Sequence, residues 1–199
     1  MFDRFFLIMT EELKQHNFSL FLKKLTELGI DTTKLQEGLG EQLKNATFAF
    51  NSDSMLCGDG TLISTILKIL TPFAVKLNNL YPEEIRVNQS TLVKVCLLHQ
   101  IAKAVRLVPN DNLWEVEKRG LAYKYSPNQP SIKTGLHSLV LAQNFGITFN
   151  EEEAEAMTVN DRLVTDEQAK WYSSLLASIV RQASEMTYMQ DNNTKKDSK

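Results

Sequence analysis

Cysteine, excess basic charge and long apolar runs are all scarce in this chain of 199 residues. Two cysteines, Cys57 and Cys96, are too few for a disulfide framework, and Cys96 lies in an apolar run where a buried thiol is expected. No run of 18 uncharged apolar residues is long enough to cross a bilayer. With 22 Lys and Arg against 24 Asp and Glu, the net charge of −2 provides no positive field for nucleic acid. Neither a membrane nor a nucleic acid is therefore predicted as a partner.

The first residues also lack the pattern of a secretion signal. Residues 1–6 are partly hydrophobic, but the polar segment 10–14 follows before an h-region or a small-residue cleavage site can form. We therefore expect a cytoplasmic protein. The length and the 43% apolar content predict one main domain.

Helical periodicity dominates the sequence. It predicts one or two amphipathic helices from Phe5 up to Gly29 and a short helix over 35–43. It also predicts long helices over 61–80 and 89–107, which end before Pro82 and Pro109 respectively. Further helices are expected at about 134–145, 151–159 and 166–190, the second with the favourable acidic first turn Glu151-Glu152-Glu153.

One segment, 113–125, has a strand-like pattern. Trp114, Val116, Leu121 and Tyr123 alternate with polar residues around Lys118-Arg119-Gly120, which predicts a small hairpin with Lys118 and Arg119 at its solvated tip. The expected fold class is therefore all-α with a small β insert.

The most informative segment is Cys96-Leu97-Leu98-His99-Gln100-Ile101-Ala102-Lys103. In a helix over 89–107, His99 shares the core-facing stripe with Leu92, Val95 and Cys96, and Lys103 lies one turn beyond it. A buried neutral histidine with a hydrogen-bonded ring is the simplest interpretation of this pattern, and a ligand or metal contact is the alternative.

Residues 97–103, Leu-Leu-His-Gln-Ile-Ala-Lys, resemble the Leu-Leu-His-Asp-Ile-x-Lys helix of the HD-domain metal-dependent phosphohydrolases. Upstream, residues 59–65 resemble a Gly-Gly-Leu-Leu-Glu-His-Ser segment from one bacterial branch of that superfamily. Ser64 stands at the position of its metal-binding His.

Three further segments resemble motifs of the same branch, in the same order. Residues 133–138 are similar to Gly-His-Gly-Glu-Lys-Ser, with Gly135 and Ser138 kept and Thr134 at the His position. Residues 152–160 are similar to Glu-Glu-x-x-Ala-Ile-Arg-Trp-His, with Asn160 at the His position. Residues 183–188 are similar to the last helix of that branch, which carries a metal-binding Asp. In this chain Ser184 stands at the position of that Asp, or Glu185 does if the register slips by one.

The resemblance implies an HD-like helical bundle over 45–190, preceded by a helical extension over 1–44 that packs on it. We expect the polar tail 191–199 to be disordered.

The resemblance also implies a metal site, which the substitutions in this chain impair. The His, His-Asp, Asp set supplies two imidazoles and two anionic oxygens to a divalent cation. Of these four positions only His99 is retained, because Ser64, Gln100 and Ser184 offer neutral oxygens. Since disturbing even an outer-shell partner costs about 10 to 100-fold in metal affinity or activity, we expect no tightly bound metal, no activated water and no catalytic residue.

The prediction is therefore a pseudoenzyme that binds a ligand or a protein partner. The former active-site pocket is expected to be lined by Ser64, His99, Gln100, Lys103, Thr134, Asn160 and Ser184. A phosphate-containing small molecule could bind there through Lys103.

Two alternatives remain open. An active HD-type phosphohydrolase would need a substitute ligand, such as Glu185, Asp59 or His137, to hold Mg or a divalent transition metal. A partner-binding protein would instead use an exposed part of the N-terminal aromatic group, for instance in a homodimer. That group consists of Phe2, Phe5, Phe6, Phe18 and Phe21.

Overall fold

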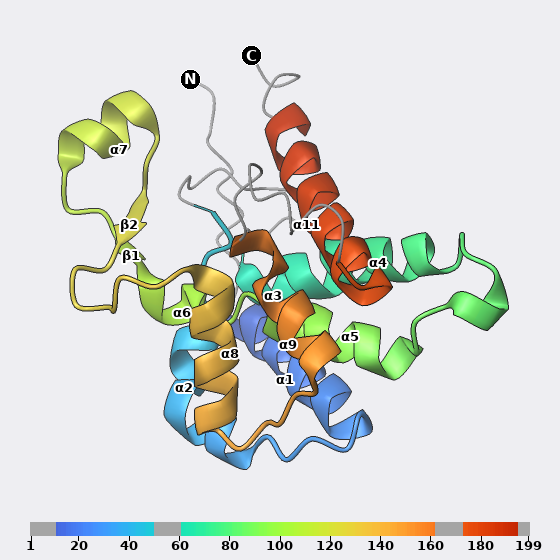
Figure 1. Cartoon of the computed structure of the whole chain (residues 1–199). Helices are drawn as coiled ribbons and strands as arrows, with labels where there is room; N and C mark the ends of the chain where they lie inside the picture. The colour runs from blue at the N-terminus through green and yellow to red at the C-terminus, as the bar shows by residue number, and fades with distance from the viewer. Residues whose placement is uncertain (1–10, 50–60, 162–172, 195–199) are drawn as a thin grey trace.

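The computed structural model of the chain describes residues 11–49, 61–161 and 173–194, which are mostly helical (Figure 1). The helices are α1 (Glu11–Glu27), α2 (Thr33–Asn45), α3 (Leu62–Thr65), α4 (Thr71–Asn78), α5 (Gln89–Leu98), α6 (Lys103–Arg106), α7 (Leu113–Arg119), α8 (Thr134–Asn144), α9 (Glu151–Thr158) and α11 (Leu175–Thr194). Strands β1 (Leu107–Pro109) and β2 (Tyr123–Tyr125) form one antiparallel pair. An all-α fold with a small β insert is thus confirmed. None of the described helices is long and apolar enough to span a membrane.

The first two helices supply part of the core. Phe18, Phe21 and Leu25 of α1 are buried with Leu35, Leu39 and Leu43 of α2. Two members of the N-terminal aromatic group are therefore core residues and cannot form an exposed dimer surface. The other three, Phe2, Phe5 and Phe6, lie outside the described residues.

The segment predicted as one helix over 61–80 contains a π-helical stretch, η1 (Ile66–Leu70), between α3 and α4. The backbone N–H of Thr71 donates to the carbonyl of Ile66, five residues back. Pro72 has no N–H to donate to the carbonyl of Lys68, four residues back, and its ring crowds that carbonyl. The wider π-helical turn gives the ring room, so the helical run can continue into α4. The run ends at Asn78, before Pro82.

The prediction of an unbroken helix over 89–107 is wrong at its centre. Helix α5 ends at Leu98, His99 is its C-cap, and helical structure resumes only at Lys103. The N–H groups of Ile101 and Lys103 bond to carbonyls three residues back. The N–H of Ala102 donates to the Ser138 Oγ of α8 instead, at 3.0 Å. A side chain distant in sequence therefore takes the place of the helical i−4 acceptor.

We expect Ser138→Ala to lower the free energy of unfolding by about 1 to 2 kcal/mol, because it leaves the buried N–H of Ala102 without an acceptor. Ser138 is fully buried, so water cannot easily replace the hydroxyl. Urea unfolding measures the effect, with Ser90→Ala at the exposed start of α5 as the control. Equal stability of the two variants would contradict the proposed role of Ser138.

The hairpin prediction is correct in existence and wrong in position. Residues 113–119 form helix α7, not a strand, and β1 and β2 lie on either side of it, with Leu107 opposite Tyr125. The Asn112 side chain accepts the N–H of Glu115 and so caps the start of α7, and Gly120, at φ 67°, ends it. Helix α7 stands away from the body in Figure 1, and its last residues Lys118 and Arg119 are exposed, as expected.

Helices α8, α9 and α11 complete the domain. The expected helices over 134–145 and 151–159 are confirmed as α8 and α9, and α9 begins with a capping box between Asn150 and Glu153. Helix α11 packs against α4 and α9. It reaches Thr194, four residues into the tail expected to be disordered, whereas residues 162–172 and 195–199 lie outside the described chain.

Candidate functional site

Four of the seven predicted pocket residues form one hydrogen-bonded cluster. The Nε2 atom of His99 lies 3.2 Å from the Ser184 Oγ of α11 and 3.1 Å from the Gln100 amide nitrogen. Asn160, after α9, donates to the same Ser184 Oγ at 3.0 Å. The other ring nitrogen of His99, Nδ1, lies 3.2 Å from the carbonyl of Cys96. The cluster joins the end of α5 to α11 and to the end of α9.

The contacts indicate which nitrogen of the neutral His99 ring carries the proton. A carbonyl only accepts, so Nδ1 carries the proton and donates to Cys96, which leaves Nε2 to accept from Ser184. Burial lowers the pKa of His99 to about 4, and the nearby charge of Lys103 contributes in the same direction, against the hydrogen bond to Cys96. The ring is therefore neutral at pH 7. Its burial and its two ring contacts confirm the interpretation of His99 as a buried, hydrogen-bonded histidine. The neighbouring Cys96 is likewise buried, and burial raises the pKa of its thiol to about 12.

The cluster is sealed from solvent at its centre. Only 1% of His99 and 1% of Ser184 is exposed. A serine hydroxyl beside a histidine is the arrangement of a nucleophile and its base, but Ser184 is buried. Within the described part of the chain, the buried Oε1 atom of Gln100 has no hydrogen-bond partner, and the amide is held through its nitrogen.

Ser64 and Lys103 have different surroundings. Ser64 is fully buried in α3, and none of the described residues forms a hydrogen bond with its Oγ. The Lys103 ammonium donates to the Phe48 carbonyl at 2.7 Å and to the Tyr188 hydroxyl at 2.8 Å, and it lies 3.9 Å from the centre of the Phe48 ring. Lys103 thus binds two aromatic residues of the chain itself.

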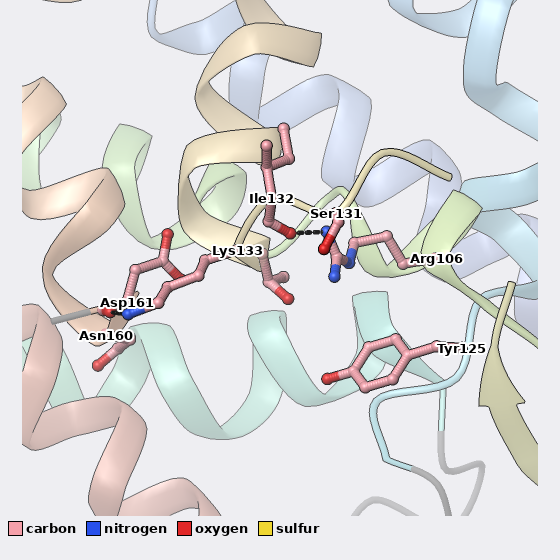
Figure 2. Close-up of a pocket in the computed structure, with 8 residues that line it drawn as sticks. Arg106, Tyr125, Ser131, Ile132, Lys133, Asn160 and Asp161 are labelled. Carbon is pink, nitrogen blue, oxygen red and sulfur yellow. Dashed lines mark hydrogen bonds between the residues drawn. The ribbon is translucent and has the colours of Figure 1, made fainter. Parts of the chain in front are cut away.

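An open pocket lies next to the cluster, on the side of Asn160 (Figure 2). Its volume is about 490 Å³. The lining residues are Arg106, Tyr125, Ser131, Ile132, Lys133, Thr134, Asn160 and Asp161. Only Thr134 and Asn160 belong to the predicted set, and the sequence analysis missed the two cations, Arg106 and Lys133. The signal for Lys133 was its place at the start of the segment 133–138, whereas Arg106 belongs to none of the matched segments.

The three charged residues of this pocket differ in how many hydrogen bonds they form. The Asp161 carboxylate accepts the N–H of Gly135 at 3.0 Å and that of Leu136 at 2.7 Å, at the start of α8. The Lys133 ammonium donates to the main-chain carbonyl of Asp161, and the Arg106 guanidinium donates to the carbonyl of Ile132. Backbone N–H groups thus hold the Asp161 carboxylate in place, whereas Lys133 and Arg106 each use only part of their hydrogen-bonding capacity on backbone carbonyls.

The substitute metal ligands do not come together in the described chain. His137 is buried, and its Nδ1 forms no hydrogen bond with the residues that the structure describes. Burial first, and the charge of Arg106 second, lower the pKa of His137. Glu185 is exposed on α11, and Asp59, like Cys57, lies outside the described residues. Within residues 11–49, 61–161 and 173–194, no three His, Cys, Asp or Glu side chains are grouped as a metal site would require.

Comparison of the chain with protein-family models, curated proteins and solved structures found no match. The resemblance to the HD-domain phosphohydrolases therefore rests on the residues of the sequence alone.

Proposed function

We propose that this chain is a degenerate HD-type helical domain that acts as a binding module without a catalytic metal. The contact between His99 and Ser184 carries the proposal. These residues are 85 positions apart and belong to two different segments of the resemblance, yet their side chains meet at 3.2 Å. Positions that hold one metal ion must converge in this way. Asn160, from a third segment, joins the same cluster.

The donor set does not fit a hydrolytic cation. Ser184 and Gln100 bring neutral groups to His99 where the resemblance implies carboxylates, so nothing in the cluster offsets the charge of a divalent ion. The Nε2 atom of His99 accepts hydrogen bonds within the protein, and a metal would have to displace them. The cluster is therefore a polar core that fixes α5 against α11, and binding falls to the open pocket beside it.

We expect the purified protein to contain no stoichiometric transition metal and to hydrolyse neither phosphomonoesters nor phosphodiesters when Mn, Fe, Co, Ni or Mg is supplied. Elemental analysis and a panel of phosphate esters test this. His99→Ala is the control that identifies any turnover as belonging to this site. About one equivalent of metal, or turnover that is lost on chelation and in His99→Ala, would show that the chain is an active HD-type phosphohydrolase with substitute ligands.

A further inference from the structure

Two cations of the open pocket have no acidic partner in the described part of the chain. No carboxylate there lies within 4.0 Å of Arg106 or Lys133, while the surface pairs Arg119–Glu115 and Lys124–Asp111 show that the chain forms ion pairs elsewhere. The one acid of the pocket, Asp161, uses its carboxylate on the backbone of α8. The pocket therefore has unneutralised positive charge.

The Arg106 guanidinium is the less satisfied of the two cations. Its Nη1 donates to Ile132, but its buried Nε has no hydrogen-bond partner among the described residues. In Figure 2 the Tyr125 ring lies below the guanidinium, 5.3 Å from the guanidinium carbon to the ring centre. Since the Nε is buried, a ligand in the pocket would contact the Nη side of the guanidinium, which can give a planar anion two parallel hydrogen bonds.

Charge and size restrict the anion. Two cations and one carboxylate give the lining a formal charge of +1, which complements one negative charge better than two. A volume of about 490 Å³ fits a small organic molecule, and Tyr125 and Ile132 provide apolar wall for its body. The hydroxyl groups of Ser131 and Thr134 add neutral donors.

We propose that this pocket binds a small organic acid through a single carboxylate, with Arg106 as the anchoring residue. The inference deepens the proposed function and rests on it only in treating the domain as a binding module. It names the ligand class and moves the site from Lys103 to Arg106.

Benzoate is the probe, because it has one planar carboxylate and one apolar ring. Isothermal titration of the whole chain should give a dissociation constant on the order of millimolar, as befits so small a ligand. Benzamide, of the same shape without the charge, should bind at least about tenfold more weakly, the equivalent of about 1.4 kcal/mol. Arg106→Ala should weaken the affinity for benzoate by about tenfold or more. Arg106→Lys keeps the charge but loses the two parallel donors of the guanidinium, so it should weaken the affinity by less.

Arg119→Ala, at the exposed end of α7, is the matched control and should leave the affinity unchanged. In the same samples, NMR titration of His137 should show its pKa rising on addition of benzoate, since the bound carboxylate offsets the charge of Arg106. If Arg106→Ala does not fold, Arg106→Lys and the His137 titration still decide the question.

Equal binding of benzoate and benzamide, or benzoate affinity unaffected in both Arg106 variants, would overturn the inference. Tighter binding of phenyl phosphate than of benzoate would overturn the choice of a monoanion. Benzoate is not an ester and needs no metal, so these outcomes are independent of the hydrolysis panel. Metal-dependent turnover in that panel would reject the proposed function and leave the binding result standing.

Discussion

Gly135→Ala is expected to lower the free energy of unfolding by about 3 kcal/mol or more, which is the upper part of the range for overpacked core substitutions. A Cβ at Gly135 would lie 2.4 Å from the main-chain oxygen of Met157 and 2.8 Å from Asp161 Oδ2. The carbonyl of Met157 belongs to α9 and cannot rotate away, so α8 and α9 would have to move apart. Because Thr134 and Asp161 line the pocket at this contact, ligand binding should weaken as well.

Gly40→Ala in α2 is the matched control, since Gly40 is also a buried helical glycine. A Cβ there would meet the end of the Phe18 ring at 3.3 Å, which a small side-chain shift relieves. Alanine also gains about 1 kcal/mol of helix propensity over glycine. We therefore expect Gly40→Ala to be close to neutral in thermal or urea unfolding. A Gly135→Ala protein as stable as Gly40→Ala would show that α8 and α9 separate at little cost.

The helices that the sequence predicted well are those fixed by local patterns. Apolar spacing and the acidic first turn were sufficient for α8 and α9, whose ends agree with the prediction to within about two residues. The two wrong predictions, an unbroken helix over 89–107 and a strand over 113–119, have different causes. The break after Leu98 depends on the Ser138 hydroxyl, 36 residues from Ala102, and no periodicity in 89–107 contains that information. In 113–119, the cap of Asn112 and the stop at Gly120 outweighed an alternating pattern of apolar residues.

The candidate site likewise has a part that the sequence predicted and a part that it did not. Position on an apolar stripe was enough to predict a buried His99, and the resemblance was enough to place Ser184 and Asn160 near it. The pocket was not predictable, because Arg106 and Lys133 are brought to one cavity by the loop that follows β2. Lys103 was assigned to a ligand because its position relative to His99 was known, whereas its actual partners, Phe48 and Tyr188, lie 55 residues before it and 85 residues after it.

The stability of the protein is expected to fall by about 3 kcal/mol between about pH 7 and pH 4 through His99 alone. Burial lowers the pKa of His99 to about 4 in the folded chain, while the ordinary value of 6.5 applies on unfolding. Between these values the unfolded chain binds a proton that the folded chain does not, so acid favours unfolding. The contribution is complete above about pH 6.5 and is lost as the pH falls towards 4.

His99→Gln removes this titration and keeps a polar group near Ser184, so it isolates the effect. The variant should be less stable than the wild type at about pH 7, and the difference should shrink by about 3 kcal/mol by about pH 4. Urea unfolding at several pH values measures it, and contributions from His137 and the carboxylates cancel because both proteins have them. His16→Gln, at an exposed position of α1, is the matched control for the substitution itself. A wild type and a His99→Gln protein that lose stability in parallel would show that His99 is not held neutral by its burial, and that the cluster around Ser184 accepts a charged ring.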